Sequence, residues 1–315
     1  MHALDAAVRL GSCGAMERRD RVDALGASGL IAFAIILAFN QVVIKLTNAG
    51  IQPVFSAGLR SIGALVVLLI WMRLRGIAIH TPRMAIGAGV ISGLLFTAEF
   101  TGLFWALDHT SVSRASIIFY SMPVHLCIMA HFWLPDERIT PMRAAGLGLA
   151  MAGVIWVLFD RSAGVRQGQA SLIGDLAALA AALGWAGIAM MARRSALSAL
   201  RPEMQLFWQL AVSSVCLMAL APLFGPLIRD FTPVFLLGLG YQVVLVASMG
   251  FLFWFFLLTI YPASGVASFS FLSPVFSVIF GWMVLGEPLS LDVMGALCLV
   301  ALGIVLINRR PRMPS

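Results

Sequence analysis

The residues with the greatest chemical potential in this sequence are ionisable side chains inside long apolar runs. Arg60 lies eight residues after Gln52, and Glu99 lies nine residues before Asp108. At about 1.5 Å per helical residue, both would lie roughly 12 to 13 Å below the same membrane edge. A charge at that depth needs water or a partner. We therefore predict an Arg60–Glu99 ion pair that lines or gates a cavity, with a purely structural pair as the alternative.

A second polar set lies in the apolar run 111–133. Spacings of seven and four residues place Arg114, Ser121 and His125 on one helical face, and Tyr120 lies on the neighbouring face. His125 could relay protons, because imidazole titrates near neutral pH. The alternative is a histidine that is hydrogen-bonded to a facing backbone carbonyl.

Amide and aromatic side chains in other apolar runs form a third candidate set. Their polar tips could orient a small zwitterion or ring-bearing molecule, while the aromatic faces bury its apolar part. Alternatively, Trp and Tyr anchor helices at the membrane interface, and Gln bridges neighbouring helices. The set consists of Asn40, Gln41, Trp185, Gln209, Tyr241, Gln242 and Trp254.

Two prolines are candidate hinges. Pro123 and Pro274 each remove a backbone hydrogen bond inside an apolar run, and they lie 151 residues apart at matching positions of two similar stretches. A helix can bend where such a bond is missing, although a static kink that only shapes packing is the alternative.

The elements that hold these residues are expected to be membrane-spanning helices. Of 315 residues, 61% are hydrophobic and 11% are charged, which leaves too few charges for a water-facing surface. The apolar runs are long enough to cross roughly 30 Å of hydrocarbon as helices, and they lack the alternation of membrane strands. We predict an all-α membrane protein with ten spans, at residues 27–47, 53–72, 84–107, 111–133, 141–159, 171–192, 203–221, 233–258, 263–285 and 289–307.

The arginines predict the orientation of these spans. Fifteen of the 21 Lys and Arg residues fall in segments on the side of the amino terminus, and three fall in the opposite loops. We expect the protein in an inner or plasma membrane. The positive-inside rule then predicts that both termini lie in the cytoplasm. We expect Lys45 and Arg114, near outer helix ends, to extend toward the headgroups. The expected cytoplasmic tails are residues 1–26 and 309–315.

The two halves of the sequence resemble each other. Residues 110–140 parallel residues 261–290, with Pro123 aligned to Pro274. Because each half contains five predicted spans, an odd number, the second half would cross the membrane in the opposite sense. Such inverted repeats are typical of many secondary transporters. The predicted units are residues 27–160 and 171–308, joined by an outer linker at 161–170.

Several stretches carry a more specific resemblance. They are VVIK at 42–45, PVFSAGLR at 53–60, the proline-centred fourth and ninth spans, and the turns LPDERIT and LGEPLS. Their order and duplication resemble the EamA family of the drug/metabolite transporter superfamily. The resemblance implies alternating access by two inverted five-helix repeats, with spans 1–4 and 6–9 around a central cavity and spans 5 and 10 outside it. It also implies transport of amino acids or related metabolites.

The sequence thus predicts a secondary transporter that exports a small polar metabolite such as an amino acid. Import in the same fold is the alternative. An intramembrane enzyme that acts on a lipid-linked substrate is a candidate from a different class. That enzyme is disfavoured, because Asp136 and Glu137 adjoin each other without a further acid, nucleophile or His motif beside them.

Few partners are expected. No GxxxxGK[ST] stretch occurs in the sequence, and the four cysteines are scattered, so neither ATP, a cofactor nor a metal is predicted. The arginines lie between apolar runs rather than in one patch, which argues against nucleic acid. The expected partners are the small-molecule substrate and the lipid bilayer, with protons as a candidate coupling ion and a second copy of the chain in a candidate homodimer.

Overall fold

The computed structural model describes residues 23–134, 139–159, 171–230, 232–250 and 272–308, together with Phe253, Leu257 and Phe269. These residues are helical apart from short connections, and an isolated bridge between Ile51 and Ile228 is the β-type pairing seen among them. The all-α prediction is therefore confirmed for the described part of the chain.

Residues 24–159 contain the helices of the first half, and residues 172–308 contain those of the second half. In the first half these are α2 (Ala24–Asn48), α3 (Pro53–Leu74), α4 (Arg83–His109), α5 (Val112–Phe119), α6 (Met122–Trp133) and α7 (Pro141–Phe159). In the second half they are α9 (Leu172–Arg194), η1 (Ala196–Ala199), α10 (Pro202–Leu220), η2 (Ala221–Phe224), α11 (Val234–Tyr241), the π-helical η3 (Gln242–Gly250), α14 (Leu272–Leu285) and α15 (Leu291–Asn308).

In the described part of the chain, seven helical segments are long and apolar enough to cross a membrane. They coincide with the first seven predicted spans to within a few residues, with α5 and α6 together forming the fourth. Three shorter apolar segments, 234–250, 272–285 and 291–307, lie at the places of the last three predicted spans. The protein is thus a multi-pass helical membrane protein, and the number of ten crossings stays a prediction.

Short polar residues and prolines set the helix starts. Asp23 accepts a hydrogen bond from the Gly26 backbone at 2.8 Å, so α2 begins three residues before the predicted start of the first span. Pro53 and Pro202 occupy first-turn positions, where a missing N–H leaves no helical bond unmade. The predicted linker at 161–170, the tail at 309–315 and most of the tail at 1–26 lie outside the described residues.

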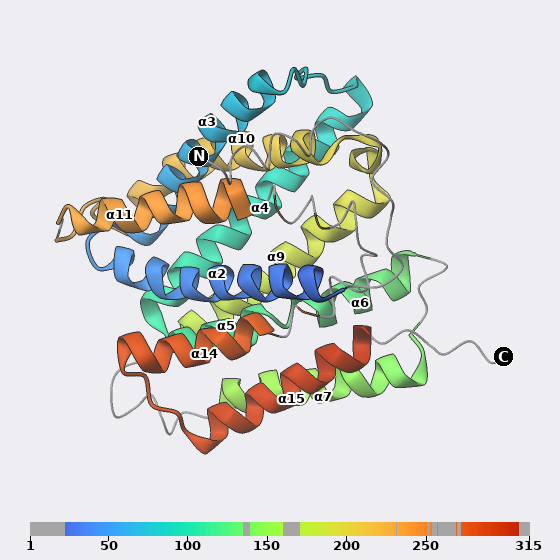
Figure 1. Ribbon diagram of the computed structural model, residues 1–315, viewed down its shortest axis with the longest axis vertical. Helices are drawn as coiled ribbons and strands as arrows, with labels where there is room; N and C mark the ends of the chain where they lie inside the picture. Colours follow the sequence, from blue (N-terminus) through green and yellow to red (C-terminus); the bar gives the residue numbers. More distant parts are fainter. Residues whose placement is uncertain are drawn as a thin grey trace.

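The helix contacts relate the two halves to each other. The first-half helix α2 packs against α11 and α14, and its counterpart α9 packs against α4 and the α5–α6 pair. The counterparts α3 and α10 pack against one another, as do α7 and α15, which lie side by side along one edge of the molecule (Figure 1). Exchanging these helices for their counterparts therefore reproduces these contacts.

The α7–α15 pair shows the relative direction of the halves. A Cβ added at Gly146 would lie 2.8 Å from the Gly303 carbonyl oxygen, and one added at Gly153 would lie 2.7 Å from that of Ala296. Contacts move backward along α15 as they move forward along α7, so these two counterparts are antiparallel. Their backbones touch because glycines remove the side chains between them.

Replacing Gly146 by Leu is expected to destabilise the protein, because the new side chain would collide with Gly303. Overpacking of this kind costs about 1–3 kcal/mol. The thermal unfolding midpoint of the detergent-purified variant should fall. Gly148→Leu is the matched control, since nothing lies within 4 Å of a Cβ at that position. Equal midpoints for the two variants would contradict the α7–α15 contact.

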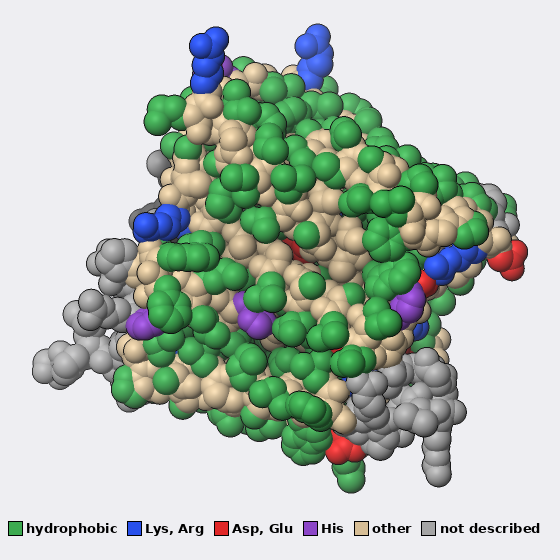
Figure 2. Space-filling model, turned by 180° about the vertical axis from the view of Figure 1, so that it is seen from behind, with side chains coloured by type: hydrophobic (Ala, Val, Ile, Leu, Met, Phe, Trp, Pro, Cys, Tyr) green, Lys and Arg blue, Asp and Glu red, His purple; other side chains and the backbone are tan. Residues whose placement is uncertain are grey.

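The outside of the bundle is apolar. Figure 2 shows a broad face covered by hydrophobic side chains, with Lys, Arg, Asp and Glu mainly at its edges. On α3, exposed Ile62, Val66 and Ile70 follow each other at four-residue spacing and form one continuous stripe. Such a stripe suits contact with lipid, where each helix satisfies its own backbone hydrogen bonds.

Candidate functional site

A cluster of aromatic and polar side chains lies where α2, α5, α9 and α14 meet. The ring of Phe119 stacks on Trp185 with centroids 5.0 Å apart, and Tyr120 meets the same indole edge-on at 6.1 Å. The Gln41 and Ser273 side chains lie beside the Tyr120 hydroxyl and interact with it. We call these five residues the central cluster. It brings three of the predicted site residues together.

A break in the fourth span positions this cluster. α5 ends at Phe119 and α6 begins at Met122, so Tyr120 lies in the interruption. Pro123 explains the place of the break, because it lacks the N–H that would bond the Phe119 carbonyl four residues earlier, and its ring clashes with that carbonyl. The candidate hinge is thus next to the central cluster. Whether Pro123 moves during function stays a prediction, as it does for Pro274 in the first turn of α14.

His125 is held within its own helix. Its Nε2 atom lies 3.2 Å from the Ser121 hydroxyl, which also donates to the Ile118 carbonyl at 2.6 Å. The predicted proximity of Ser121 and His125 on one face is therefore present. The contact to a facing backbone carbonyl, the alternative reading of this histidine, is not among the described interactions.

Four buried amide oxygens lack a hydrogen-bond partner in the described structure. They belong to Asn40, Gln41 and Asn48 on α2 and to Gln242 at the start of η3. An unsatisfied buried polar group costs about 1–3 kcal/mol. These oxygens can therefore accept hydrogen bonds from a bound molecule that carries N–H or O–H groups.

Arg60 and Glu99 are both buried, with 4% and 5% of their surfaces exposed. Their charges act on one another, yet no ion pair within 4 Å joins them among the described residues. The Arg60 guanidinium instead lies over the ring of Phe100, 4.2 Å from its centroid, and its Nε atom has no hydrogen bond. The predicted direct pair is thus absent in this structure, because the residue that follows Glu99 on α4 binds the guanidinium by a cation–π contact.

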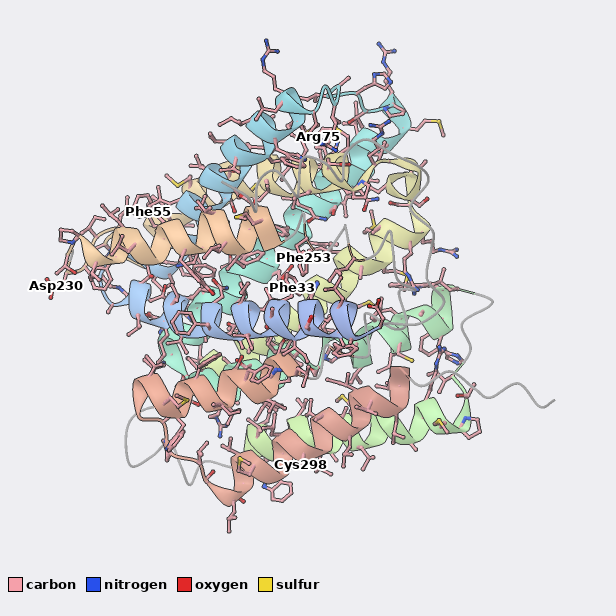
Figure 3. All side chains as sticks on the ribbon, viewed as in Figure 1. Phe33, Phe55, Arg75, Asp230, Phe253 and Cys298 are labelled. Carbon is pink, nitrogen blue, oxygen red and sulfur yellow. The ribbon has the colours of Figure 1, made fainter. Side chains whose placement is uncertain are left out.

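The remaining predicted residues bridge helices away from the central cluster. The Tyr241 hydroxyl donates to the Ile36 carbonyl at 2.9 Å, and the Gln242 amide nitrogen lies 3.3 Å from the Thr47 hydroxyl. Both contacts join the second half to α2. The ring pair of Phe33 and Phe253, in the middle of Figure 3, also joins α2 to the second half. The Tyr241 and Gln242 contacts match the helix-bridging alternative.

Gln209 behaves similarly. Its amide nitrogen lies 3.4 Å from the Ser92 hydroxyl and joins α10 to α4. Trp254, the other aromatic residue of the predicted set, lies outside the described residues.

A buried ion pair that the sequence did not suggest joins the two halves. Arg114 of α5 contacts Asp175 of α9 at 2.7 Å, and both side chains are almost fully buried. Thr110 donates to the same carboxylate at 2.9 Å, and Arg114 also donates to the Val157 carbonyl. The expectation that Arg114 extends to the headgroups is wrong, because a carboxylate from the other half lies at its depth.

Lys45 also departs from the expected snorkelling. Its ammonium donates to the carbonyls of Leu107 at 3.0 Å and Thr110 at 2.6 Å, at the end of α4. These carbonyls have no partner within their own helix, so they attract the cation. Lys45 therefore ties α2 to α4.

Two further contacts close the same end of the bundle. Glu287, in the turn before α15, accepts hydrogen bonds from the backbone of Val112 and Ser113 at 2.6 and 2.9 Å and from the Ser113 hydroxyl at 2.7 Å. Arg229 binds Asp108 through two bonds of 2.7 and 2.9 Å. We call this region the Asp108 end. The Glu287 and Arg229 contacts and the Arg114–Asp175 pair each connect the first half to the second.

The fold and these sites define a helical membrane protein built from two related halves. A family model described as the EamA-like transporter family matches residues 24–159 and again residues 172–309. The chain belongs to the EamA-like transporter family. It is accordingly a membrane transporter and not an enzyme.

Individual relatives agree with this assignment. The chain is 30% identical over 294 residues to the uncharacterized transporter YvbV of Bacillus subtilis, covering 90% of this chain and 92% of that protein. It is 28% identical over 217 residues to the aromatic amino acid exporter YddG of Ancylobacter novellus, covering 67% and 74%. A solved crystal structure with 21% identity superposes with a TM-score of 0.61 over 89% of this chain and 98% of the other, which shows a shared fold.

Proposed function

We propose that this transporter exports an amino acid with an aromatic or similarly ring-bearing side chain, by alternating access between two inverted five-helix repeats. The observation that carries the proposal is the central cluster, in which stacked rings from both halves adjoin Gln41, whose amide oxygen has no partner among the described residues. A relative named as an aromatic amino acid exporter supports the same substrate class.

The chemistry of the cluster fits such a substrate. The rings of Phe119, Tyr120 and Trp185 can bury an aromatic side chain by offset or edge-to-face contact. The free amide oxygens of Asn40 and Gln41 can accept hydrogen bonds from an ammonium group. Apolar walls with a few placed polar groups are typical of small-molecule sites.

The antiparallel packing of α7 on α15 and the exchangeable helix contacts support the inverted repeat. With ten spans and both termini in the cytoplasm, the Asp108 end is the outer end of the bundle in the inner membrane. The ionic contacts there join the halves, so this conformation is closed toward the outside. Opening to the outside would require these contacts to separate.

A reconstituted transport assay tests the function. Purified protein in liposomes loaded with unlabelled L-phenylalanine should take up labelled L-phenylalanine by counterflow, with a rate that saturates. Flux that rises linearly without counterflow would indicate a pore and contradict the proposal. Untargeted metabolite profiling of cells and medium, with and without the protein, gives the substrate and direction together. Accumulation of the affected amino acid inside protein-producing cells would indicate import.

Replacing Trp185 by Ala should raise the KM for a ring-bearing amino acid by about tenfold or more, because the largest aromatic face of the central cluster is lost. Trp282→Ala is the control, since Trp282 lies on α14 with half of its surface exposed. Both variants should be compared at equal amounts of folded protein in counterflow. An unchanged KM in Trp185→Ala would separate the cluster from the substrate site.

A further inference from the structure

Glu99 differs from the other buried carboxylates described in the structure. Asp175 is held by Arg114 and Thr110, and Glu287 accepts three hydrogen bonds. Glu99 is also buried, but it takes part in no described hydrogen bond and no described ion pair within 4 Å. Asp175 and Glu287 are thus held in place by protein contacts, whereas the Glu99 carboxylate has no such contact among the described residues.

The charged neighbour of Glu99 does not neutralise it by contact. Arg60 acts on it electrostatically across more than 4 Å while its guanidinium lies over Phe100. With Arg60 charged, the two residues together are neutral when Glu99 is ionised and carry one positive charge when it is protonated. A carboxylate that is buried without hydrogen bonds is poorly solvated, so a proton can bind or leave without breaking a protein contact.

Apart from Arg60 on α3, the helices that pack against α4 place no described charged side chain at the depth of Glu99. α9 faces Glu99 through Gly184, where an added Cβ would lie 3.3 Å from its Cα atom. The ionisable groups of α9 lie at its ends, as Asp175 in the first turn and Arg193 and Arg194 in the last. Glu203 is half-buried in the first turn of α10.

Two further helices that pack against α4 carry cations that are already bound. Lys45 of α2 donates to two carbonyls, and Arg114 of α5 pairs with Asp175. Arg60 is therefore the charged side chain that governs Glu99 among the described residues.

The position of Glu99 links it to the central cluster. Gly184, its contact on α9, immediately precedes Trp185, whose indole stacks on Phe119. The backbone of Glu99 on α4 therefore packs against the residue that precedes Trp185, one of the rings that we assign to the substrate. This places an ionisable group beside, but outside, the cluster.

We propose that Glu99 is a proton-binding site that couples substrate export to proton entry, with Arg60 as its positioning partner. The inference rests on the proposed function. In each cycle the Glu99 carboxylate takes one proton from the outer solution and releases it to the cytoplasm, while one substrate molecule moves outward. No covalent bond to the substrate changes, and the charge of the Arg60–Glu99 pair alternates between neutral and positive.

Glu99→Gln tests the coupling, because the amide keeps the shape but cannot exchange a proton. Liposomes with an imposed pH gradient should let the unchanged protein concentrate labelled L-phenylalanine by up to about tenfold per pH unit, as one proton per substrate allows. The Glu99→Gln variant should lose this concentration yet keep counterflow without a gradient within about twofold. Glu99→Asp should keep the response to the gradient, and Glu203→Gln should behave as the unchanged protein.

Each alternative result has a clear meaning. Gradient-driven concentration that persists in Glu99→Gln would overturn the proton site while leaving the export function intact. Loss of counterflow in a folded Glu99→Gln would also overturn it, since an uncoupled carrier must still exchange. If the unchanged protein moves none of the twenty amino acids in counterflow, the proposed function itself fails, and the coupling proposal falls with it.

Discussion

Replacing Asp175 by Asn is expected to lower the free energy of unfolding by about 3–5 kcal/mol, because Arg114 would remain buried without its countercharge. The 2.7 Å ion pair lies at a depth where neither side chain reaches water. Asparagine preserves the volume and one acceptor oxygen, so packing changes little. The loss would thus report the charge and not a cavity.

The measurement is denaturant or thermal unfolding of the detergent-purified variant, followed by intrinsic Trp fluorescence. Asp292→Asn is the matched control, since this first-turn acid of α15 bonds the Trp156 indole at 3.3 Å near the surface and no other described residue. A double change of Arg114 and Asp175 to Leu should recover much of the stability, because it removes both buried charges. Similar losses of unfolding free energy in Asp175→Asn and Asp292→Asn would show that the buried ion pair contributes no more to stability than a surface contact.

This ion pair also shows where prediction from the sequence stopped. Hydropathy and helix-start residues predicted seven spans to within a few residues, because each depends on a local segment. Arg114 was misjudged because depth along one helix does not reveal which side chain of another helix lies opposite. Asp175 is 61 residues away in the chain, and only the packing of α5 on α9 brings it near.

The central cluster was predictable in part for the same reason. Gln41, Tyr120 and Trp185 are rare polar or amphipathic residues in apolar runs, so their type alone marked them as candidates. Phe119 and Ser273 carry no such mark, because Phe and Ser occur throughout these spans in packing roles. Their part in the cluster follows from the break before Pro123 and from the position of α14, which are tertiary features.

Glu287→Gln is expected to weaken the closed Asp108 end. The carboxylate accepts bonds from two backbone N–H groups at the start of α5 and from the Ser113 hydroxyl, and all three join the second half to the first. Bonds to a charged acceptor contribute about 1.5–3 kcal/mol each, and the helix N-terminus adds to the attraction. An amide offers one acceptor oxygen, and its NH₂ group would face another donor.

Accessibility labelling can measure the resulting opening. Ser116 is fully buried on α5, three residues after Ser113, which bonds Glu287, and four residues before Tyr120. It is replaced by Cys in a variant whose four native cysteines are Ser. A membrane-impermeant thiol reagent added outside the cell should label this cysteine at least about tenfold faster when Glu287→Gln is also present, because a loss of 1.4 kcal/mol already shifts the equilibrium tenfold. Glu203→Gln should leave the rate unchanged.

The labelling result would also decide whether the LGEPLS turn, which contains Glu287, stabilises the fold or gates transport. If Glu287 only stabilises the fold, the Gln variant should unfold more readily while its buried cysteine keeps the original rate in the protein that remains folded. If Glu287 holds the outer end shut, labelling rises in folded protein, and slower return to the closed state should reduce counterflow as well. An unchanged labelling rate together with preserved counterflow would rule out a gating role for Glu287. Its contact with the start of α5 would then persist through every state of the transport cycle.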